Sequence, residues 1–195
     1  MKIHHFTTFT TSPLHHLHHF TTFTTRSLTP HPSMTPPTII MDTREQTPLQ
    51  FTRLASEVGT LTTGDYSIRG METSFAVERK SVADLIGSLS TERERFMREI
   101  DRLRGFDFAR LLIVGSRREV EQGTYRSRMS PKAAVASLLA IEARGVPIAW
   151  AETPARAARM IEEWVTYFVR ERAKPFATAA ELKELVGILD GVGAV

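Results

Sequence analysis

Three charged residues stand side by side at the end of an apolar stretch in the middle of the chain. The segment FAVERKSVAD, residues 75–84, starts like a buried strand and then carries Glu78, Arg79 and Lys80. Because side chains on a strand alternate between two faces, Glu78 and Lys80 point one way and Arg79 points the other. One face therefore presents a carboxylate beside an ammonium. Alone, such a pair is typical of a solvated strand edge with a weak salt bridge.

A Gly-Asp dipeptide supplies a second acid for the same face. Residues 58–80 have the pattern of a β-hairpin, which would bring Asp65 of LTTGDYSI close to Glu78. Two carboxylates at close range raise each other's pKa unless a cation lies between them, and an oxygen-rich site of this kind suits Mg²⁺ or Mn²⁺. Asp42, at the end of the first predicted strand, would complete the metal shell or hold a second ion. Lys80 would hold or deprotonate a water, or neutralise developing negative charge.

Together these residues predict a metal-assisted hydrolase, in which an ion stabilises charge on a phosphodiester and acidifies the attacking water. The predicted metal ligands are Asp42, Asp65 and Glu78, and the predicted catalytic set adds Lys80. A Gly-Asp dipeptide by itself is most often a turn. The order and spacing of the motifs, rather than any one of them, favour the hydrolase.

Patterns elsewhere in the chain predict the elements that must hold these residues. A short β-prone run, TIIM, precedes Asp42, and ARLLIVG has the continuous apolar character of a strand covered on both faces. Ser81 is predicted as the N-cap of the helix VADLIGSL, with Asp84 at the third helical position. Further helices are predicted at residues 91–104, from Pro131 to Gly145 and from Pro154 onward, with a strand in VPIAWAE. This order predicts an α/β fold, a mixed central sheet flanked by helices.

Three blocks of sequence carry a family resemblance. DTREQTPLQF, LTTGDYSI and FAVERKSVADLIGSL resemble the nuclease domain of the XPF family of structure-specific DNA endonucleases, whose signature is Gly-Asp, a gap, then Glu-Arg-Lys, three residues and Asp. The resemblance continues less specifically through RERFMREIDRL and LLIVGS and covers most of residues 38–170. It implies a restriction-endonuclease-like fold and divalent-metal-dependent cleavage of one strand near a single-strand/double-strand junction.

The resemblance also implies roles for individual residues. The family's acidic and basic positions fall on Asp42, Arg44, Glu45, Asp65, Glu78, Arg79, Lys80 and Asp84. Arg44, Glu45, Arg79 and Asp84 are expected to support the site by orienting ligands or contacting phosphate. Since all of these positions carry the family's residue, the chain does not look like a non-catalytic paralogue. It departs from the family at Val114, where many members have Glu, and at Glu99, where members often have Gln.

Net charge gives no general argument for DNA binding. The whole chain has a formal charge of +3, but residues 34–195 hold 23 Lys and Arg against 22 Asp and Glu, a charge of +1. A local patch must therefore contact any nucleic acid. The predicted contacts are arginines on the helix after the site and on loops predicted to flank the site: Arg95, Arg98, Arg102, Arg126 and Arg128, with Arg117 and Arg118 on the same kind of loop.

Composition divides the chain into three parts. Residues 1–33 hold all seven His and no acid, which predicts a disordered tail, or a segment upstream of a true start at Met34. A His-based metal site and an organelle transit leader are weaker alternatives for this tail. Residues 34–174 are the predicted nuclease domain. Residues 175–195 are a predicted C-terminal helical tail, in which LVGILDGVGAV resembles part of a helix-hairpin-helix motif.

The sequence thus predicts a Mg²⁺- or Mn²⁺-dependent endonuclease that acts on branched or flap DNA in repair or recombination. A homodimer or a nuclease partner subunit is possible, and a cytoplasmic protein of bacterial or phage type is expected. No apolar run reaches the roughly 18 residues of a membrane span, and the absence of Cys excludes disulfides and Cys-ligated zinc. Two alternatives remain. One is a DNA-binding scaffold or subunit that is inactive without a partner, and the other is a sequence-specific or mismatch-directed nuclease with the same fold.

Overall fold

The computed structural model describes residues 36–175 and residue 178. The chain divides into two units, residues 1–33 and residues 34–195, and the fold described below belongs to the second. The predicted N-terminal tail lies outside the described residues, as does the predicted C-terminal tail apart from Pro175 and Thr178.

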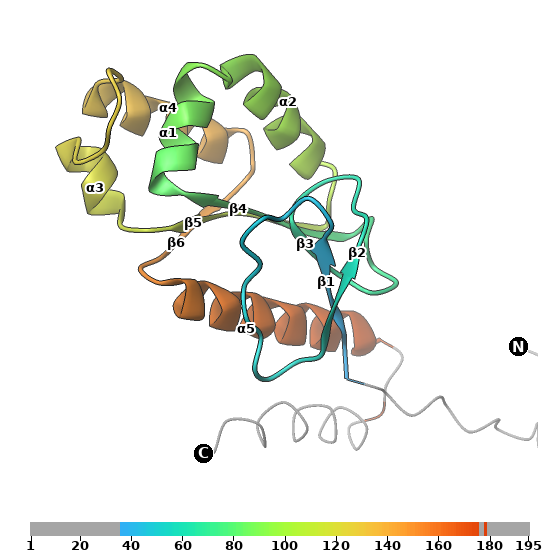
Figure 1. Ribbon diagram of the computed structural model, residues 1–195. Coiled ribbons are helices and arrows are strands. Elements are labelled where there is room, and N and C mark those ends of the chain that lie inside the picture. The colour runs from blue at the N-terminus through green and yellow to red at the C-terminus, as the bar shows by residue number, and fades with distance from the viewer. Residues whose placement is uncertain (1–35, 176–177, 179–195) are drawn as a thin grey trace, which may run out of the picture. The chain divides into compact units, whose positions relative to one another are not determined.

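One six-stranded sheet organises the described residues (Figure 1). Its strands are β1 (Ile39–Asp42), β2 (Ser56–Gly59), β3 (Tyr66–Ile68), β4 (Phe75–Ser81), β5 (Phe108–Val114) and β6 (Ile148–Ala151). Their order is β2-β1-β3-β4-β5-β6. β3 pairs antiparallel with both β1 and β4, whereas β1 pairs with β2, β4 with β5, and β5 with β6 in parallel. The predicted mixed sheet is confirmed.

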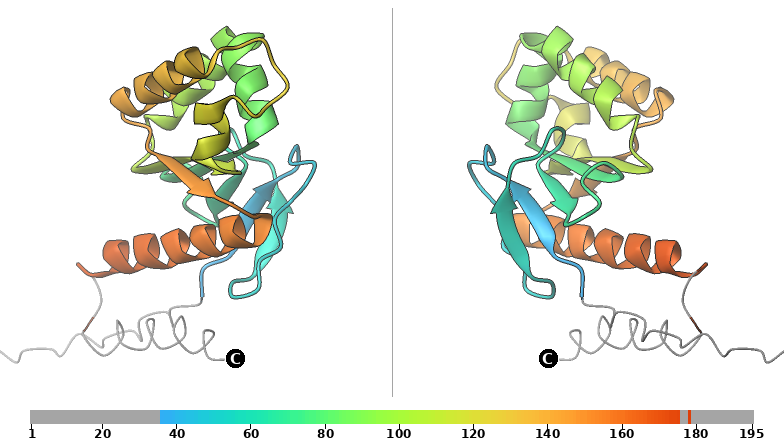
Figure 2. Two further views of the ribbon diagram at one scale, coloured as in Figure 1. Left: turned by 90° about the vertical axis from the view of Figure 1, so that its left-hand side faces the viewer. Right: turned by 90° about the vertical axis from the view of Figure 1, so that its right-hand side faces the viewer.

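Helices cover both faces of the sheet. They are α1 (Val82–Ser90), α2 (Arg93–Leu103), α3 (Arg117–Gln122), α4 (Pro131–Ala143) and α5 (Pro154–Ala173). The first four lie on one face and α5 lies along the other, as the two side views show (Figure 2). The resulting three-layer arrangement gives the sheet two separate apolar cores, one on each face.

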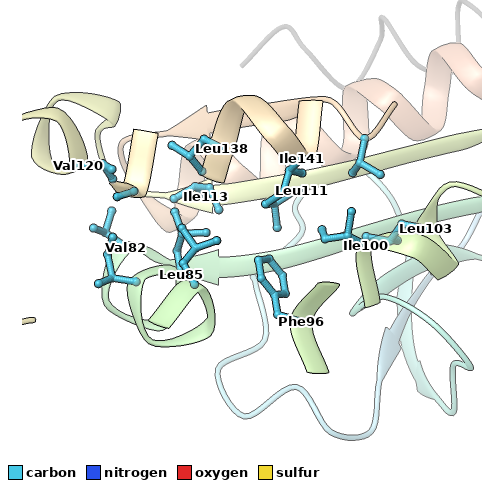
Figure 3. Packing of buried hydrophobic residues seen from close by; sticks show 14 of the residues in the cluster. Val82, Leu85, Phe96, Ile100, Leu103, Leu111, Ile113, Val120, Leu138 and Ile141 are labelled. Atoms are coloured by element: carbon cyan, nitrogen blue, oxygen red, sulfur yellow. The ribbon is translucent and has the colours of Figure 1, made fainter. Parts of the chain in front are cut away.

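Strand alternation decides which face each β4 side chain reaches. Ala76 belongs to the core under α1, α2 and α4, whereas Phe75 and Val77 belong to the core against α5. The first core packs Phe96, Ile100 and Leu103 of α2 and Leu85 of α1 over the sheet (Figure 3). By the same alternation, Glu78 and Lys80 project toward the α1–α2 side and Arg79 toward the other side.

Local signals fix the helix starts as the sequence predicts. Ser81 is the N-cap of α1 and its hydroxyl accepts the Asp84 N–H, Ser130 caps α4 directly before Pro131, and Thr153 caps α5 directly before Pro154. In α2, the buried residues recur at helical spacing while arginines and acids occupy the exposed positions. No helix of residues 36–175 has the length and apolar character that crossing a membrane requires.

Two predicted elements differ from the structure. Residues 58–68 are not one strand of a hairpin, because β2 ends at Gly59 and an irregular segment leads to β3, so only β3 and β4 form the hairpin. Arg117 and Arg118, predicted on a loop, instead begin α3. Ser116 and Glu119 form a capping box there that gives this short helix its start.

Candidate active site

The β3–β4 pairing brings the two predicted acids together. Tyr66 lies opposite Val77 in the antiparallel register, which places Asp65 opposite Glu78. The backbone locks this position, because the Asp65 N–H donates to the Val77 carbonyl at 2.8 Å and the Arg79 N–H donates to Asp65 Oδ2 at 2.7 Å. The expected proximity of Asp65 and Glu78 follows from these contacts.

The backbone geometry at position 64 explains why a glycine precedes Asp65. The φ of Gly64 is +79°, and a Cβ there would lie 3.1 Å from the Val77 carbonyl oxygen. A side chain at this position would strain the backbone and press on the strand that carries Glu78. The Gly-Asp dipeptide therefore lies where two neighbouring strands approach each other closely, and it is not an exposed turn.

Lys80 and Glu78 form the carboxylate–ammonium pair that the sequence predicts. Lys80 Nζ donates to Glu78 Oε1 at 2.9 Å, and both side chains are largely buried. The ammonium also lies 5.0 Å from the ring centroid of Phe96 on α2, a cation–π contact. The Lys80 ammonium thus contacts both Phe96 of α2 and Glu78 of β4.

Burial is the main influence on the charges of the pair. Burial, and then the Glu78 carboxylate, raise the pKa of Asp65 to about 7. Burial also raises the pKa of Glu78, and Glu99 adds to the effect. Burial acts to lower the pKa of Lys80, but the surrounding carboxylates, Glu78 first, raise it on balance. The site would gain stability from a further cation.

An open cleft of about 520 Å³ gives access to this pair. Its walls come from the segment after β1, the segment before β3, β4, α1 and α2. The lining residues are Arg44, Gln46, Thr62, Thr63, Gly64, Asp65, Glu78, Lys80, Ala83, Asp84, Gly87, Ser88, Glu92, Arg95, Glu99 and Arg102. The lining thus combines acidic side chains with three arginines.

Asp42 is placed differently from the other predicted ligands. Its Oδ1 accepts the Arg44 backbone N–H at 2.8 Å and Arg44 Nε at 2.6 Å, and its Oδ2 accepts the Leu61 N–H at 2.7 Å. Burial acts to raise the pKa of Asp42, but these donors lower it on balance. Asp42 is buried and does not line the cleft, although its backbone N–H donates to the Asp65 carbonyl.

Glu45 and Arg79 form a bidentate ion pair outside the cleft. Arg79 Nε and Nη2 donate to the two Glu45 carboxylate oxygens at 2.9 and 2.7 Å, and Nη2 also donates to Thr47 Oγ1 at 2.7 Å. Burial acts to raise the pKa of Glu45, but Arg79 lowers it on balance. This pair ties the segment after β1 to the end of β4, a supporting position.

Asp84 lies at the mouth of the cleft on the first turn of α1. Its Oδ2 accepts the Ser81 hydroxyl at 2.7 Å while its backbone N–H donates to the same hydroxyl at 3.1 Å. Asp84 therefore stabilises the start of α1, and it also adds a carboxylate to the cleft lining.

The predicted DNA contacts fall into two groups. Arg95 and Arg102 line the cleft from α2, and each forms an ion pair within the helix, with Glu92 and Glu99 respectively. Arg98 is exposed on α2 outside the cleft lining, and Arg126 and Arg128 are exposed in the segment between α3 and α4. Their contact with DNA stays a prediction.

Sequence reasoning missed part of the cleft. Glu99, noted only as a departure from the family, faces Glu78 and Lys80 closely enough to act on both charges. Gln46, Thr62, Thr63 and Glu92 also line the cleft. Helical spacing could have predicted the position of Glu99. It is three residues after Phe96, which contacts Lys80, so the two side chains lie on the same side of α2.

The pair of Asp65 and Glu78 fits a divalent ion of the Mg²⁺ class. Among residues 36–175 no three His, Cys, Asp or Glu side chains are grouped as a complete ligand set. Mg²⁺ is commonly held by one or two carboxylates together with waters and substrate phosphate. Asp65 Oδ1 and Glu78 Oε2 have no hydrogen-bond partner among the described residues, and both residues line the cleft. The roles of Asp42, Asp65, Glu78 and Lys80 stay predictions.

Comparisons with known proteins agree with this architecture. The model of the ERCC4 domain matches residues 41–163. The solved structure of XPF from Aeropyrum pernix has a TM-score of 0.51 at 20% identity, and that of the same protein in a complex with DNA has 0.53 at 22%. Each comparison covers 81% of this chain and 82% of the other. Curated proteins give no match. The shared fold is the predicted restriction-endonuclease-like α/β fold.

Proposed function

Because this chain belongs to the ERCC4 domain family, we propose that it is a divalent-metal-dependent DNA endonuclease that hydrolyses phosphodiester bonds at branched or flap structures. Family membership confirms the XPF-type resemblance of the sequence motifs. The observation that carries the activity is the cross-strand pair of Asp65 and Glu78, with Lys80 bound to Glu78 at 2.9 Å, in an open cleft.

Asp65 and Glu78 would hold the ion and Lys80 would act beside it. A Mg²⁺ or Mn²⁺ ion held by these two carboxylates would supply charge stabilisation for the phosphate and would lower the pKa of a bound water. The raised pKa of Lys80 keeps its ammonium protonated near neutral pH. Lys80 would therefore position the water and neutralise charge on the phosphate in the transition state, rather than accept the proton.

The cleft suits a DNA backbone rather than a small molecule. It is open, polar and lined by Arg44, Arg95 and Arg102 around the acids. Phosphate contacts position a duplex without reporting its sequence, which suits recognition of a DNA structure. XPF from Aeropyrum pernix has been solved in a complex with DNA, and the shared fold supports DNA as the substrate here.

A partner requirement is the alternative within this proposal. Three arginines of the described residues line the cleft, so one chain offers few phosphate contacts there. A second copy of the chain or a nuclease partner would enlarge the contact. The proposed setting is DNA repair or recombination in the cytoplasm of a bacterium or phage-infected cell.

Cleavage of a labelled DNA panel tests the proposal. Single strand, duplex, 3′ flap, 5′ flap and splayed arm are incubated with the full chain in Mg²⁺, in Mn²⁺ and in EDTA. The expected result is metal-dependent cutting near a junction. Equal cutting of all substrates would contradict the structure specificity, and cutting in EDTA would contradict the metal dependence.

A further inference from the structure

Asp42 lacks the features of a metal ligand. Both of its carboxylate oxygens accept hydrogen bonds, from Arg44 and from the Leu61 backbone, and its side chain is only 1% exposed. Asp65 and Glu78 each keep one oxygen without such a partner in the described part of the chain and line the cleft. Oδ1 already accepts two hydrogen bonds and the side chain does not line the cleft, so an ion in the cleft would reach Asp42 only if its segment rearranged.

Arg44 is fixed at one edge and open at the other. Its Nε donates to Asp42 and its Nη2 donates to the Leu61 carbonyl at 2.9 Å, yet 68% of its side chain is exposed. Among the described residues, Nη1 has no partner. Arg44 lines the same cleft as Asp65 and Glu78, so this exposed side chain is within the site that holds the carboxylate pair.

A guanidinium held in this way is suited to a phosphate. Its planar fork can donate two parallel hydrogen bonds to phosphate oxygens while the opposite edge stays bound to a carboxylate. An arginine fixed before the substrate arrives loses less conformational freedom on binding than a free side chain. The carboxylate that fixes it contributes to substrate binding without touching the substrate.

We propose that Asp42 is a positioning residue and not a metal ligand, and that it fixes Arg44 as a phosphate-binding arm beside Asp65 and Glu78. This inference rests on the proposed endonuclease function and names how the site grips its substrate. The two hydrogen bonds to the Leu61 backbone then also have a role. They attach Asp42 and Arg44 to the segment that leads to Asp65.

A double-mutant cycle on cleavage tests the coupling. In Asp42→Asn, the remaining amide oxygen can keep the Leu61 bond, whereas the NH₂ group cannot accept from Arg44. Asp42→Asn and Arg44→Ala are each expected to lower single-turnover cleavage by about 10- to 100-fold, and the double variant to lie within about threefold of Arg44→Ala. Arg44→Lys should stay impaired because Lys lacks the fork. Independent, multiplying effects would overturn the inference.

Metal-induced thermal stabilisation gives a readout apart from activity. Asp42→Asn should keep the increase in Tm that Mg²⁺ or Mn²⁺ gives the full chain, whereas Asp65→Asn should lose it. Loss of the increase in a folded Asp42→Asn protein would make Asp42 a ligand and overturn the inference. This comparison separates a positioning role from a ligand role because both variants remove one carboxylate charge.

DNA affinity without metal tests the arm even if Asp42→Asn does not fold. In EDTA, Arg44→Ala should reduce the slope of log affinity against log salt by about one, the effect of one lost phosphate contact. The matched control is Arg159→Ala, an exposed arginine on α5 across the sheet, which should leave the slope unchanged. An unchanged slope in Arg44→Ala would overturn the inference. A reduced slope in a protein that neither cuts nor responds to metal would support the arm and contradict the endonuclease.

Discussion

At the scale of single residues, the site depends on two carboxylates that the backbone forces together. Asp65 and Glu78 are opposite residues of an antiparallel pair, and the Arg79 N–H holds Asp65 in place. Burial raises the pKa of both carboxyl groups, so holding two carboxylates here without a bound cation is unfavourable. The arrangement is preorganised for a cation, because no backbone change is needed to bring the two ligands together.

The pH dependence of stability should report Asp65. Its pKa is raised from 3.8 to about 7 on folding, so the folded protein binds this proton more tightly than the unfolded chain. Unfolding then releases a proton between these values, and the metal-free protein should lose stability as pH rises from about 4 through about 7. Asp65→Asn should flatten the decrease in Tm measured in EDTA between pH 5 and 8. A wild-type-like decrease in Asp65→Asn would contradict this origin.

Glu99 should tune metal affinity. Its carboxylate raises the pKa values of both Glu78 and Lys80, so it adds negative potential to the site. Glu99→Gln is expected to raise the Mg²⁺ concentration for half-maximal cleavage about three- to tenfold, while the rate at saturating Mg²⁺ changes little. Glu94→Gln, an exposed acid on the same helix, is the control. Equal metal requirements in wild type and Glu99→Gln would disprove the tuning.

At the scale of elements, the sequence predicted what is local and missed what depends on distant contacts. The cap Ser81 and the helix starts at Pro131 and Pro154 were predicted because each signal lies within one turn. The β3–β4 pairing was predicted because few residues separate the strands. The double hydrogen bonding of Asp42 was not predicted, since its partner Leu61 is 19 residues away and belongs to an irregular segment.

Glu162 shows how a distant contact supports the site. Its Oε1 accepts the backbone N–H groups of Thr52, Arg53 and Leu54 at 2.9, 2.6 and 3.2 Å, across more than 100 residues of sequence. This buried carboxylate on α5 fixes the far end of the segment that begins with Arg44 and Glu45. Helical spacing places it on the buried face of α5, four residues after Ala158 and three before Val165, but the sequence does not show which backbone groups it contacts.

Neutralising Glu162 should destabilise the fold. Glu162→Gln is expected to lower the free energy of unfolding by about 1–3 kcal/mol, because charge-assisted bonds to three backbone N–H groups are weakened. Glu163→Gln, the next residue, pairs on the surface with Arg156 and Arg159 and should change stability by less than about 0.5 kcal/mol. Urea unfolding of both variants measures the difference. Equal effects would show that the three N–H bonds contribute little.

At the scale of the whole molecule, substrate binding follows from where charge is concentrated. Residues 34–195 have nearly balanced charge, yet Arg44, Arg95 and Arg102 all line the cleft. DNA affinity should therefore depend on this cleft rather than on the general surface. The α5 face lies across the sheet from α1 and α2 (Figure 1), whose residues line the cleft, and it should contribute little.

The salt dependence of DNA binding tests this distribution. With about five phosphates neutralised, the slope of log affinity against log salt should be roughly −4 to −5 in EDTA. The double variant Arg95→Ala/Arg102→Ala should reduce its magnitude by about two, since two phosphate contacts are lost. Arg156→Ala/Arg159→Ala on α5 is the matched control and should keep the wild-type slope. Equal slopes in both double variants would contradict a cleft-centred contact.

The most direct measurement of the central claim is single-turnover cleavage of a junction substrate by wild type, Asp65→Asn and the control Asp107→Asn across a Mg²⁺ titration. Asp107 is an exposed acid that does not line the cleft. We expect Asp107→Asn to match wild type, and Asp65→Asn to lose cleavage by at least about a thousandfold while keeping its affinity for the same DNA in EDTA. Cleavage by Asp65→Asn at the wild-type rate would contradict the assignment of the metal-binding pair.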